Sequence, residues 1–412
     1  MNTAVAKRPA VTILSRINKF TITHEIDELG IHVKRVLHIS KYYYPFIGGI
    51  EQVARDAVRA LQGVVEQKVL CFDHDKNENI NTVDDVEVIR CKCQCKLFSQ
   101  SISLEMASKF KNLLDTFKPD YIIFHYPNPF FARILLQYIP KETKLILYWH
   151  LDIFRQKILG KFFHFQNIAL LKRADKIVAT SPNYIEGSKY LSRFKSKCVV
   201  IPNCIDEKRL EKTPKAIELS EKIKKENEGK TICLSVGRLV PYKGYEYLIK
   251  SAQKLDDNYV FFIIGDGELK TKLERQSKKY PYIKFLGKQT DDELKAYYIA
   301  ADIFCFTSIT KNEAFGIALA EAMYFGLPAI TYTIPGSGVN YVSLNGETGL
   351  EVANKDVEAY ADTIRNFAVD KDKRKKLGEA AITRVSQNFL FDRFKKLIVD
   401  LMQTQTEMLQ KD

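Results

Sequence analysis

Short apolar strands alternate with amphipathic helices along most of the chain, and this alternation constrains the fold more than any other feature. The strand-like runs of the first half lie at 33–40, 67–72, 86–91, 120–125, 144–149, 176–181 and 197–201. Those of the second half lie at 231–236, 259–264, 283–286, 303–307 and 328–332. Helical patterns lie between several of them, at 50–61, 103–117, 244–255, 267–279, 291–300, 316–326 and 356–368. Strands separated by helices form parallel sheets with helices on both faces. The pattern predicts an α/β chain with two doubly wound domains.

The length agrees with two domains, because 412 residues exceed the roughly 250 to 300 that one hydrophobic core supports. The sequence IPNCID at 201–206 carries a proline and an asparagine that interrupt the pattern, so we place the link between the domains there. We therefore predict an N-terminal extension, a first domain, a second domain and a C-terminal helix over 1–32, 33–205, 206–391 and 392–412.

The positive charge of the chain lies mainly in its first half. The formal net charge is +13, of which residues 1–206 contribute +10 and residues 207–412 contribute +3. A basic half favours an anionic partner, and zinc-finger spacing, an RNP-type aromatic signature and an arginine-rich arm are all missing from the sequence. We expect no nucleic acid and favour an anionic membrane surface or a lipid diphosphate. No apolar run reaches the roughly 18 residues of a membrane span, and the N-terminus does not read as a secretory signal, so we expect a cytoplasmic protein.

The eight cysteines predict free thiols, because they are scattered along a chain expected in a reducing compartment. Cys91, Cys93 and Cys95 alternate with Lys92 and Gln94, which predicts one buried face of a strand. A zinc site needs four ligands, and no second pair of cysteines or histidines completes this set. We predict no metal site.

The loop after strand 231–236 carries two cations, Arg238 and Lys243, and opens into a helix at Gly244. Cations on a glycine-containing loop at a helix N-terminus can surround a phosphate or diphosphate. A solvated loop without a ligand is an equal alternative on this motif alone.

The segment after strand 303–307 carries two carboxylates, Glu313 and Glu321, on either side of a helix start at Gly316. Carboxylates accept hydrogen bonds from sugar hydroxyls, and the free amides of Phe315, Gly316 and Ile317 suit an anion. A glutamate in a helix rich in Ala, Leu and Met needs a partner when it is buried, which favours a ligand-binding role for Glu321 over simple exposure.

Three further positions follow strands. Gly48 and Gly49 let the backbone approach a ligand at a helix N-terminus, or form an ordinary turn. His150 ends the strand 144–149, where a histidine can meet a ligand or be structural, and Gly265 lies in a strand-to-helix turn. The dinucleotide fingerprint GxGxxG is missing, which argues against a nicotinamide or flavin enzyme.

Taken together these segments resemble the retaining glycosyltransferases of family 4, which have the GT-B fold of two Rossmann-like domains facing a central cleft. The resemblance covers about residues 33–391. It rests on GGIE (48–51), WHLDI (149–153), SPNY (181–184), IPNCID (201–206), VGRLVPYKG (236–244), IIGDGEL (263–269), FLGKQTDDEL (285–294), NEAFGIALAEAMYFGLP (312–328) and NGETGL (345–350).

The resemblance implies a role for each candidate residue. Arg238 and Lys243 match the cations that hold the donor diphosphate and replace a divalent metal, so no cofactor is expected. Glu313 matches the glutamate at the donor sugar, and Glu321 the one at the ribose diol. Gly48 and Gly49 match the glycine loop near the phosphates, and His150 matches the histidine near the reacting sugar. Gly265 matches a glycine near the nucleotide. The amides of Phe315, Gly316 and Ile317 match those beside the donor sugar.

Within the family the chain is similar to bacterial polysaccharide mannosyltransferases that act on lipid-linked oligosaccharides of O-antigen or capsule. This implies a nucleotide-sugar donor, with GDP-mannose favoured and a UDP-sugar as the alternative. It also implies a saccharide or lipid-linked acceptor and peripheral binding at the inner face of the plasma membrane. Rival hypotheses are an epimerase or phosphorylase with this fold, and a catalytically silent GT-B subunit. Cys204 stands where the family usually has glycine, and Leu151 where relatives often have a small polar residue.

Overall fold

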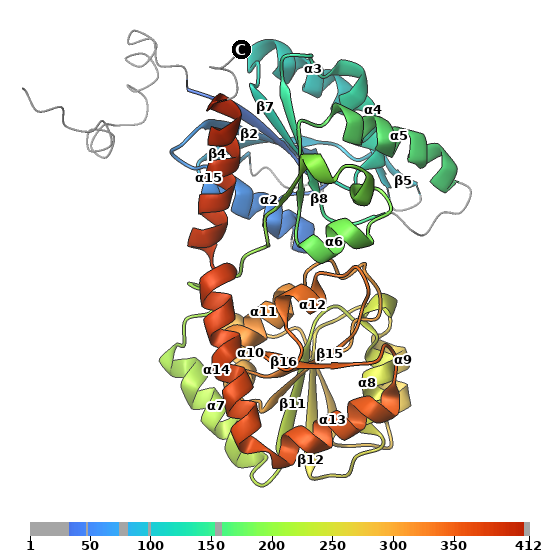
Figure 1. Cartoon of the computed structure of the whole chain (residues 1–412), viewed down its shortest axis with the longest axis vertical. Helices are drawn as coiled ribbons and strands as arrows, with labels where there is room; N and C mark the ends of the chain where they lie inside the picture. The colour runs from blue at the N-terminus through green and yellow to red at the C-terminus, as the bar shows by residue number, and fades with distance from the viewer. Residues whose placement is uncertain (1–32, 47, 74–80, 98–99, 153–158, 408–412) are drawn as a thin grey trace, which may run out of the picture.

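Two open sheets, one in each half of the chain, form the framework of the protein (Figure 1). This computed structural model describes residues 33–407 apart from 47, 74–80, 98–99 and 153–158. The extension expected at 1–32 lies outside the described residues. The predicted fold class, an α/β chain with two parallel-sheet domains, is confirmed.

The first sheet has the strand order β10-β9-β8-β7-β1-β2-β4-β3. Every neighbouring pair in it is parallel except β3 and β4. The bounds of its strands are β1 (Arg35–Ile39), β2 (Glu66–Phe72), β3 (Thr82–Val83), β4 (Val86–Cys91), β7 (Tyr121–Tyr126), β8 (Lys144–Trp149), β9 (Lys176–Ala179) and β10 (Cys198–Val200). A separate two-stranded sheet pairs β5 (Cys95–Leu97) with β6 (Gln100–Ile102).

Different helices cover the two faces of the first sheet. Along β7, Ile122 and Phe124 pack with α3 and α4, whereas Tyr121 and Ile123 pack with α2 and α15, because successive side chains of a strand point to opposite faces. The sheet therefore lies between two helical layers, as its apolar strands predict. The helices concerned are α2 (Gly49–Ala60), α3 (Met106–Thr116), α4 (Pro129–Tyr138), α5 (Leu159–Arg173), α6 (Pro182–Gly187) and α15 (Phe391–Glu407).

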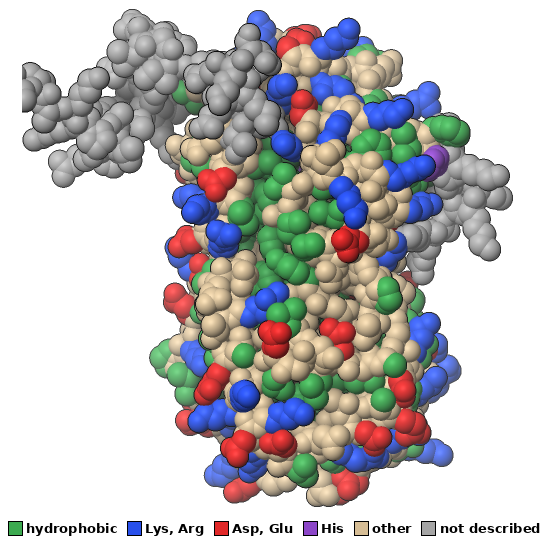
Figure 2. All heavy atoms as spheres, in the orientation of Figure 1, with side chains coloured by type: hydrophobic (Ala, Val, Ile, Leu, Met, Phe, Trp, Pro, Cys, Tyr) green, Lys and Arg blue, Asp and Glu red, His purple; other side chains and the backbone are tan. Residues whose placement is uncertain are grey.

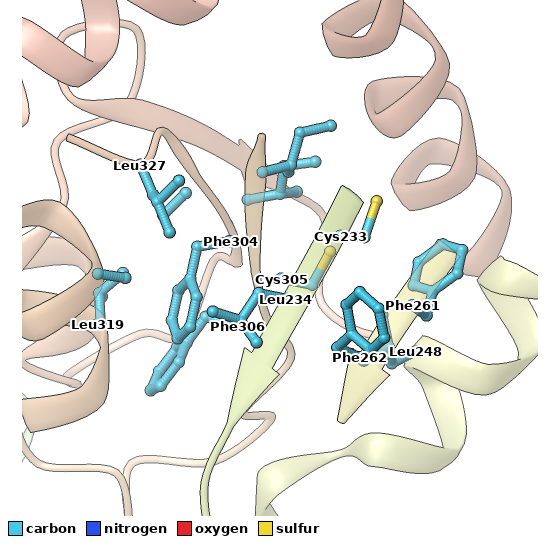
Figure 3. Close-up of a cluster of buried hydrophobic side chains, with 14 of the residues drawn as sticks. Cys233, Leu234, Leu248, Phe261, Phe262, Phe304, Cys305, Phe306, Leu319 and Leu327 are labelled. Atoms are coloured by element: carbon cyan, nitrogen blue, oxygen red, sulfur yellow. The ribbon is translucent and has the colours of Figure 1, made fainter. Parts of the chain in front are cut away.

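The second sheet is parallel throughout and has the order β13-β12-β11-β14-β15-β16. Its strands are β11 (Thr231–Val236), β12 (Tyr259–Ile264), β13 (Ile283–Gly287), β14 (Ile303–Phe306), β15 (Ala329–Tyr332) and β16 (Gly349–Val352). Figure 3 shows the centre of its core, where side chains of β11, β12 and β14 meet those of the surrounding helices. The order reverses next to β11, so the loops after β11 and β14 lie at a topological switch point, where such sheets bind ligands.

One helix of the second domain begins where a capping signal in the sequence places its start. The capping box of Thr290 and Glu293 is present, and α10 starts directly after Thr290. The bounds are α7 (Pro214–Glu226), η4 (Pro241–Lys243), α8 (Tyr245–Ala252), α9 (Lys270–Ser277), α10 (Asp291–Ala300), α11 (Ile317–Tyr324), α12 (Val339–Val342), α13 (Val357–Val369) and α14 (Lys371–Asn388).

Two segments connect the domains, and they lie side by side. Ile205 forms a parallel bridge with Leu390, and its backbone N–H donates to the Phe389 carbonyl at 2.9 Å. Arg59 of α2 lies over the Phe391 ring, 4.7 Å from the ring centre. Beyond this crossing α15 packs along α2 on the first domain (Figure 1).

Helix α15 supplies apolar side chains to the first domain, and its removal should therefore destabilise that domain. One of these side chains belongs to Ile398, which is 1% exposed. We expect Ile398→Ala to lower the free energy of unfolding by about 2 to 5 kcal/mol through the cavity it leaves. Urea unfolding would measure this loss. Ile382→Ala on α14, whose side chain is 40% exposed, is the control and should cost clearly less.

The structure differs from the sequence analysis at several elements, and two of the differences have a clear physical cause. The strand expected through Cys91, Cys93 and Cys95 is wrong, because β4 ends at Cys91 and Cys95 begins β5 in another sheet. Helix α14 was missed because its sequence is highly charged and only four of its residues are buried.

No helix in the described part of the chain is both long and apolar enough to span a bilayer. On the face seen in Figure 2, Lys and Arg side chains gather along the top and right edges of the first domain, whereas the second domain mixes both signs. This distribution follows the uneven charge of the sequence.

Candidate active site

The carboxyl edges of the two sheets face each other and are in contact. Thr180, after β9, donates its hydroxyl hydrogen to the carbonyl of Ala314, after β14, at 3.0 Å. Lys311 of the same loop donates to the Gly187 carbonyl at 2.7 Å, and its ammonium lies 3.6 Å from a carboxylate oxygen of Asp152. The loops that follow the strands of both sheets therefore meet between the domains.

The loop after β11 is folded so that Lys243 turns back toward its start. Gly244 has a φ of +68°, and a side chain there would collide with the Thr307 carbonyl. The Thr307 hydroxyl in turn donates to the Lys243 carbonyl at 3.1 Å. This close contact between the loops after β11 and β14 requires glycine and fixes the position of the Lys243 side chain.

The structure brings Lys243 and Glu313 together as an ion pair. The pair is sheltered, with side-chain exposures of 13% and 11%. The hydroxyl of Ser308 donates to the same Glu313 carboxylate at 3.0 Å. Arg238, by contrast, is exposed, and its guanidinium donates to the Tyr242 hydroxyl at 3.4 Å. One cation is thus held in place while the other keeps its freedom to reach a ligand.

Gly265 supports the same loop from β12. A side chain at Gly265 would collide with the Gly237 carbonyl, just before Arg238. The Gly265 N–H donates to the Gly287 carbonyl at 2.8 Å, and the Gly237 N–H to the Ile264 carbonyl at 2.9 Å. The carboxyl ends of β11, β12 and β13 are therefore joined by backbone hydrogen bonds. Gly265 contributes by letting the backbone after β12 lie close to the Gly237 carbonyl.

The start of α11 presents backbone rather than side chains. Gly316 is its N-cap with a φ of 95°, in the left-handed region. The Phe315 ring is 2% exposed and packs edge-on against Phe389, with ring centres 5.4 Å apart. The N–H groups of Gly316 and Ile317 are among the first amides of the helix, which have no partner within it, and the N–H of Phe315 directly precedes them in the chain.

Glu321 is held by partners from distant parts of the chain. Its carboxylate pairs with Arg209 and accepts the Tyr298 hydroxyl hydrogen at 3.1 Å. Burial raises the pKa of Glu321 above its usual value, and Arg209 and Tyr298 oppose that rise. Arg209 also binds Asp291 at 3.1 Å. Sequence reasoning missed Arg209, because nothing near it in the sequence marks a partner 112 residues away.

Gly48 and Gly49 lie at the N-terminus of α2, on the edge of the first sheet that faces the second domain. Gly48 is the N-cap, in an extended conformation. A Cβ on Gly49 would meet nothing within 4 Å, whereas a Cβ on Gly48 would collide with the Glu51 carboxylate, so the helix start is open at Gly49 and is covered by the Glu51 side chain at Gly48.

His150 is buried directly after β8, with 4% exposure. One of its ring nitrogens lies 3.0 Å from a ring nitrogen of His125. Burial lowers the pKa of His150 to about 3, so the ring is neutral at physiological pH. It can act through a hydrogen bond but not as a cation.

Asp152 and Lys311 form a contact between the domains that the sequence analysis missed. The Asp152 side chain is fully buried and accepts hydrogen bonds from the Trp149 indole at 2.9 Å and the Ser188 hydroxyl at 2.8 Å. Lys311 approaches its other oxygen from the second domain. The position of Lys311 directly before the NEAFG motif was the available signal.

Two family models match the chain, each over a different part of it. "Glycosyltransferase Family 4" matches residues 47–209, and "Glycosyl transferases group 1" matches residues 216–384. The boundary between the matches lies next to the crossing at Ile205.

Similar proteins are found among curated sequences and solved structures. O-antigen chain mannosyltransferase C of Escherichia coli is 28% identical over 378 residues, covering 90% of this chain and 99% of its own length. D-rhamnosyltransferase WbpZ of Pseudomonas aeruginosa is 29% identical over 359 residues, covering 86% of this chain and 92% of its own. The structure of Anabaena Alr3699/HepE in complex with UDP and glucose has a TM-score of 0.72 at 19% identity, covering 90% of this chain and all of its own. The last comparison supports the GT-B fold.

Proposed function

The chain belongs to the glycosyltransferases that join a family 4 domain to a group 1 domain, and we propose that it transfers mannose from GDP-mannose to a saccharide acceptor with retention of the anomeric configuration. The observation that carries the site assignment is the sheltered pair of Lys243 and Glu313 at the edge facing the first domain. The pair combines a cation for a diphosphate with a carboxylate for sugar hydroxyls.

The proposed reaction breaks the bond between the anomeric carbon and the diphosphate oxygen. Negative charge then grows on the diphosphate, and the Lys243 ammonium, the Arg238 guanidinium and the helix start at Gly316 stabilise it. These groups take the role that a divalent metal has in other transferases. The acceptor oxygen forms the new bond on the face that the diphosphate leaves, and its proton passes to the departing phosphate oxygen.

Two carboxylates hold the rest of the donor in this proposal. Glu313 accepts hydrogen bonds from the mannose hydroxyls, and Lys243, held beside it, contacts the diphosphate. Glu321 accepts from the ribose diol. Arg209 and Tyr298 keep the Glu321 carboxylate oriented. Gly48 and Gly49 approach the phosphates from the first domain in this proposal, with open space beside Gly49 and with the Glu51 side chain turned away from Gly48.

Binding of free nucleotides tests the identity of the donor. We expect calorimetric titration to give tighter binding of GDP than of UDP or ADP, by about tenfold or more, the worth of one well-placed hydrogen bond. The name of the Escherichia coli relative supports a mannose donor, whereas the Pseudomonas aeruginosa relative is named for D-rhamnose and the HepE structure holds UDP and glucose. Tighter binding of UDP would replace GDP-mannose by the UDP-sugar alternative.

The stereochemical part of the proposal has its own measurement. Proton NMR of the first product, recorded before equilibration, reports the configuration of the new linkage. An α-linked product from the α-configured donor is expected. A β-linked product would exclude the same-face mechanism while leaving the transferase assignment intact.

We further propose that the acceptor is lipid-linked and that the first domain binds an anionic membrane surface. Phe165 on α5 is 77% exposed and Leu104, after β6, is 82% exposed. Together with the +10 formal charge of residues 1–206, these apolar side chains suit an anionic bilayer surface.

Vesicle flotation checks this membrane proposal. The protein should float with vesicles that contain phosphatidylglycerol and not with pure phosphatidylcholine, and salt should release it. Phe165→Ser should weaken flotation. Val369→Ser, at an exposed position of the second domain, is the control and should not weaken it. Equal recovery with both kinds of vesicle, or with neither, would reject electrostatic membrane binding.

A further inference from the structure

Three histidines lie in a row on one face of the first sheet. His38 is on β1, His125 on β7, and His150 follows β8, with exposures of 0%, 1% and 4%. The neighbouring residues Leu37, Phe124 and Trp149 belong to the core on the α3 and α4 face, so the histidines point to the α2 and α15 face. A buried polar row of this kind needs internal hydrogen bonds.

His125 and His150 bond to each other through defined ring nitrogens. The Nδ1 of His125 lies 3.0 Å from the Nε2 of His150. Tyr148 stacks on both rings, with interplanar angles of 15° and 13°. Since Nε2 of His150 is used in this bond, Nδ1 is the nitrogen that it can offer to a ligand. Asp152, two residues on, contacts Lys311 of the second domain, so this end of β8 lies at the facing edges.

Both rings are neutral. Burial lowers the pKa of His150 to about 3 and holds the pKa of His125 well below its usual value. A neutral imidazole carries one N–H, so only one of the two facing nitrogens is protonated. Either His125 donates to His150, or His150 donates to His125.

The surroundings of His125 decide between these arrangements. Its Nε2 is buried and has no hydrogen-bond partner among the described residues. If His150 were the donor, the proton of His125 would sit on this Nε2 as a buried N–H without an acceptor. If His125 is the donor, Nε2 carries only a lone pair, and buried N–H groups without a partner are the rarer case in proteins.

His38 follows the same preference. The Gln67 amide donates to the Val58 carbonyl at 3.1 Å, which turns its oxygen toward His38 Nε2 at 2.8 Å. His38 therefore carries its proton on Nε2, and its unpartnered Nδ1 is again a lone pair. Both buried nitrogens that lack partners thus take the less costly form.

We propose that His125 is a positioning residue that donates its Nδ1 hydrogen to His150 and so fixes His150 with its own proton on Nδ1. His150 then presents a hydrogen-bond donor, not an acceptor, to an oxygen of the bound nucleotide sugar. This step rests on the proposed glycosyl transfer, and it adds the direction of the hydrogen bond and the residue that sets it.

Nitrogen NMR of the uniformly ¹⁵N-labelled full chain tests the tautomer without any assay of activity. Signals of His150 and His125 are assigned by their loss in His150→Gln and His125→Asn. At neutral pH we expect His150 with Nδ1 protonated and Nε2 unprotonated. A proton on Nε2 of His150 would overturn the proposal even if sugar transfer proceeds normally, so its failure is distinct from failure of the function.

The same spectra identify the oxygen that His150 meets. If it is a diphosphate oxygen, GDP alone shifts the His150 Nδ1 signal. If it is a sugar oxygen, GDP-mannose shifts that signal and GDP does not. A signal that stays unchanged with both ligands, under conditions where calorimetry shows binding, contradicts the proposed contact.

Kinetics test whether His125 acts through His150. His125→Leu removes the donor and should lower kcat/KM about tenfold, as the loss of one oriented hydrogen bond does. His125→Asn places an amide N–H near the former Nδ1 and should restore most of the activity. The double variant His125→Leu/His150→Ala should be no slower than His150→Ala alone. If the losses of kcat/KM in the two single variants multiply in the double variant, His125 acts independently of His150 and the positioning role is overturned. The NMR spectra of the wild-type chain decide the tautomer even if His125→Leu does not fold.

Discussion

Lys243→Ala should lower the turnover number by about a hundredfold or more, the size of loss seen when one preorganised charge-stabilising group is removed. The reason is that the Lys243 ammonium is sheltered, held beside Glu313 and supported by the contact of its carbonyl with Thr307. It needs little reorganisation to meet the diphosphate as charge develops. A radiolabelled-sugar transfer assay at saturating donor measures the change.

Loss of Lys243 also leaves Glu313 without its cation, so the variant needs controls for folding. Lys250→Ala, on the exposed side of the following helix α8, should retain full activity. The pair Lys243→Met/Glu313→Gln removes both charges and should still be slow, although its unfolding temperature should stay close to that of the wild type. Normal turnover in Lys243→Ala would remove this residue from the transfer step. Arg238→Ala should act in the same direction.

Gly187→Ala should lower turnover by about a hundredfold while leaving both domains folded, because small displacements of catalytic groups have costs of this order. Gly187 ends α6 in the first domain, and a Cβ there would collide with the Gly336 backbone of the second domain. The backbone at Gly187 is outside the left-handed region, so alanine causes no local strain. The substitution therefore acts on the approach of the two domains.

Glu186→Ala, one residue earlier on α6 with 73% side-chain exposure, is the matched control and should be fully active. Small-angle scattering should give a larger radius of gyration for Gly187→Ala than for this control. Full activity of Gly187→Ala would mean that transfer does not require the contact between Gly187 and Gly336. That result would leave the roles of Lys243 and Glu313 untouched.

The sequence predicted the repeated strand and helix pattern well, because apolar periodicity and capping residues act locally. It also placed Lys243 and Glu313 on loops after strands, and the parallel sheet brings these loops together. It did not predict the positioning groups. Arg209 contacts Glu321, and His125 contacts His150, although each pair is far apart in the sequence. Only the packing of strands and helices brings the partners together.

The failures have physical causes of the same kind. The run Cys91 to Cys95 alternates between cysteine and polar residues, as a half-buried strand does. The pairing of β4 with β2 nevertheless ends at Cys91, and Cys95 begins β5, which belongs to another sheet. Helix α14 has few buried residues, so its sequence lacks the apolar stripe by which helices are recognised.

The packing of α15 on α2 also sets an order of events during synthesis. The first sheet emerges from the ribosome early, but the helix that covers part of its second face is translated only after the whole of the second domain. Until then Val53, Ala57 and their neighbours present an uncovered apolar surface, whereas β11 to β16 have their own helices at hand. The first domain therefore completes its packing only when α15 has been synthesised, after every element of the second domain.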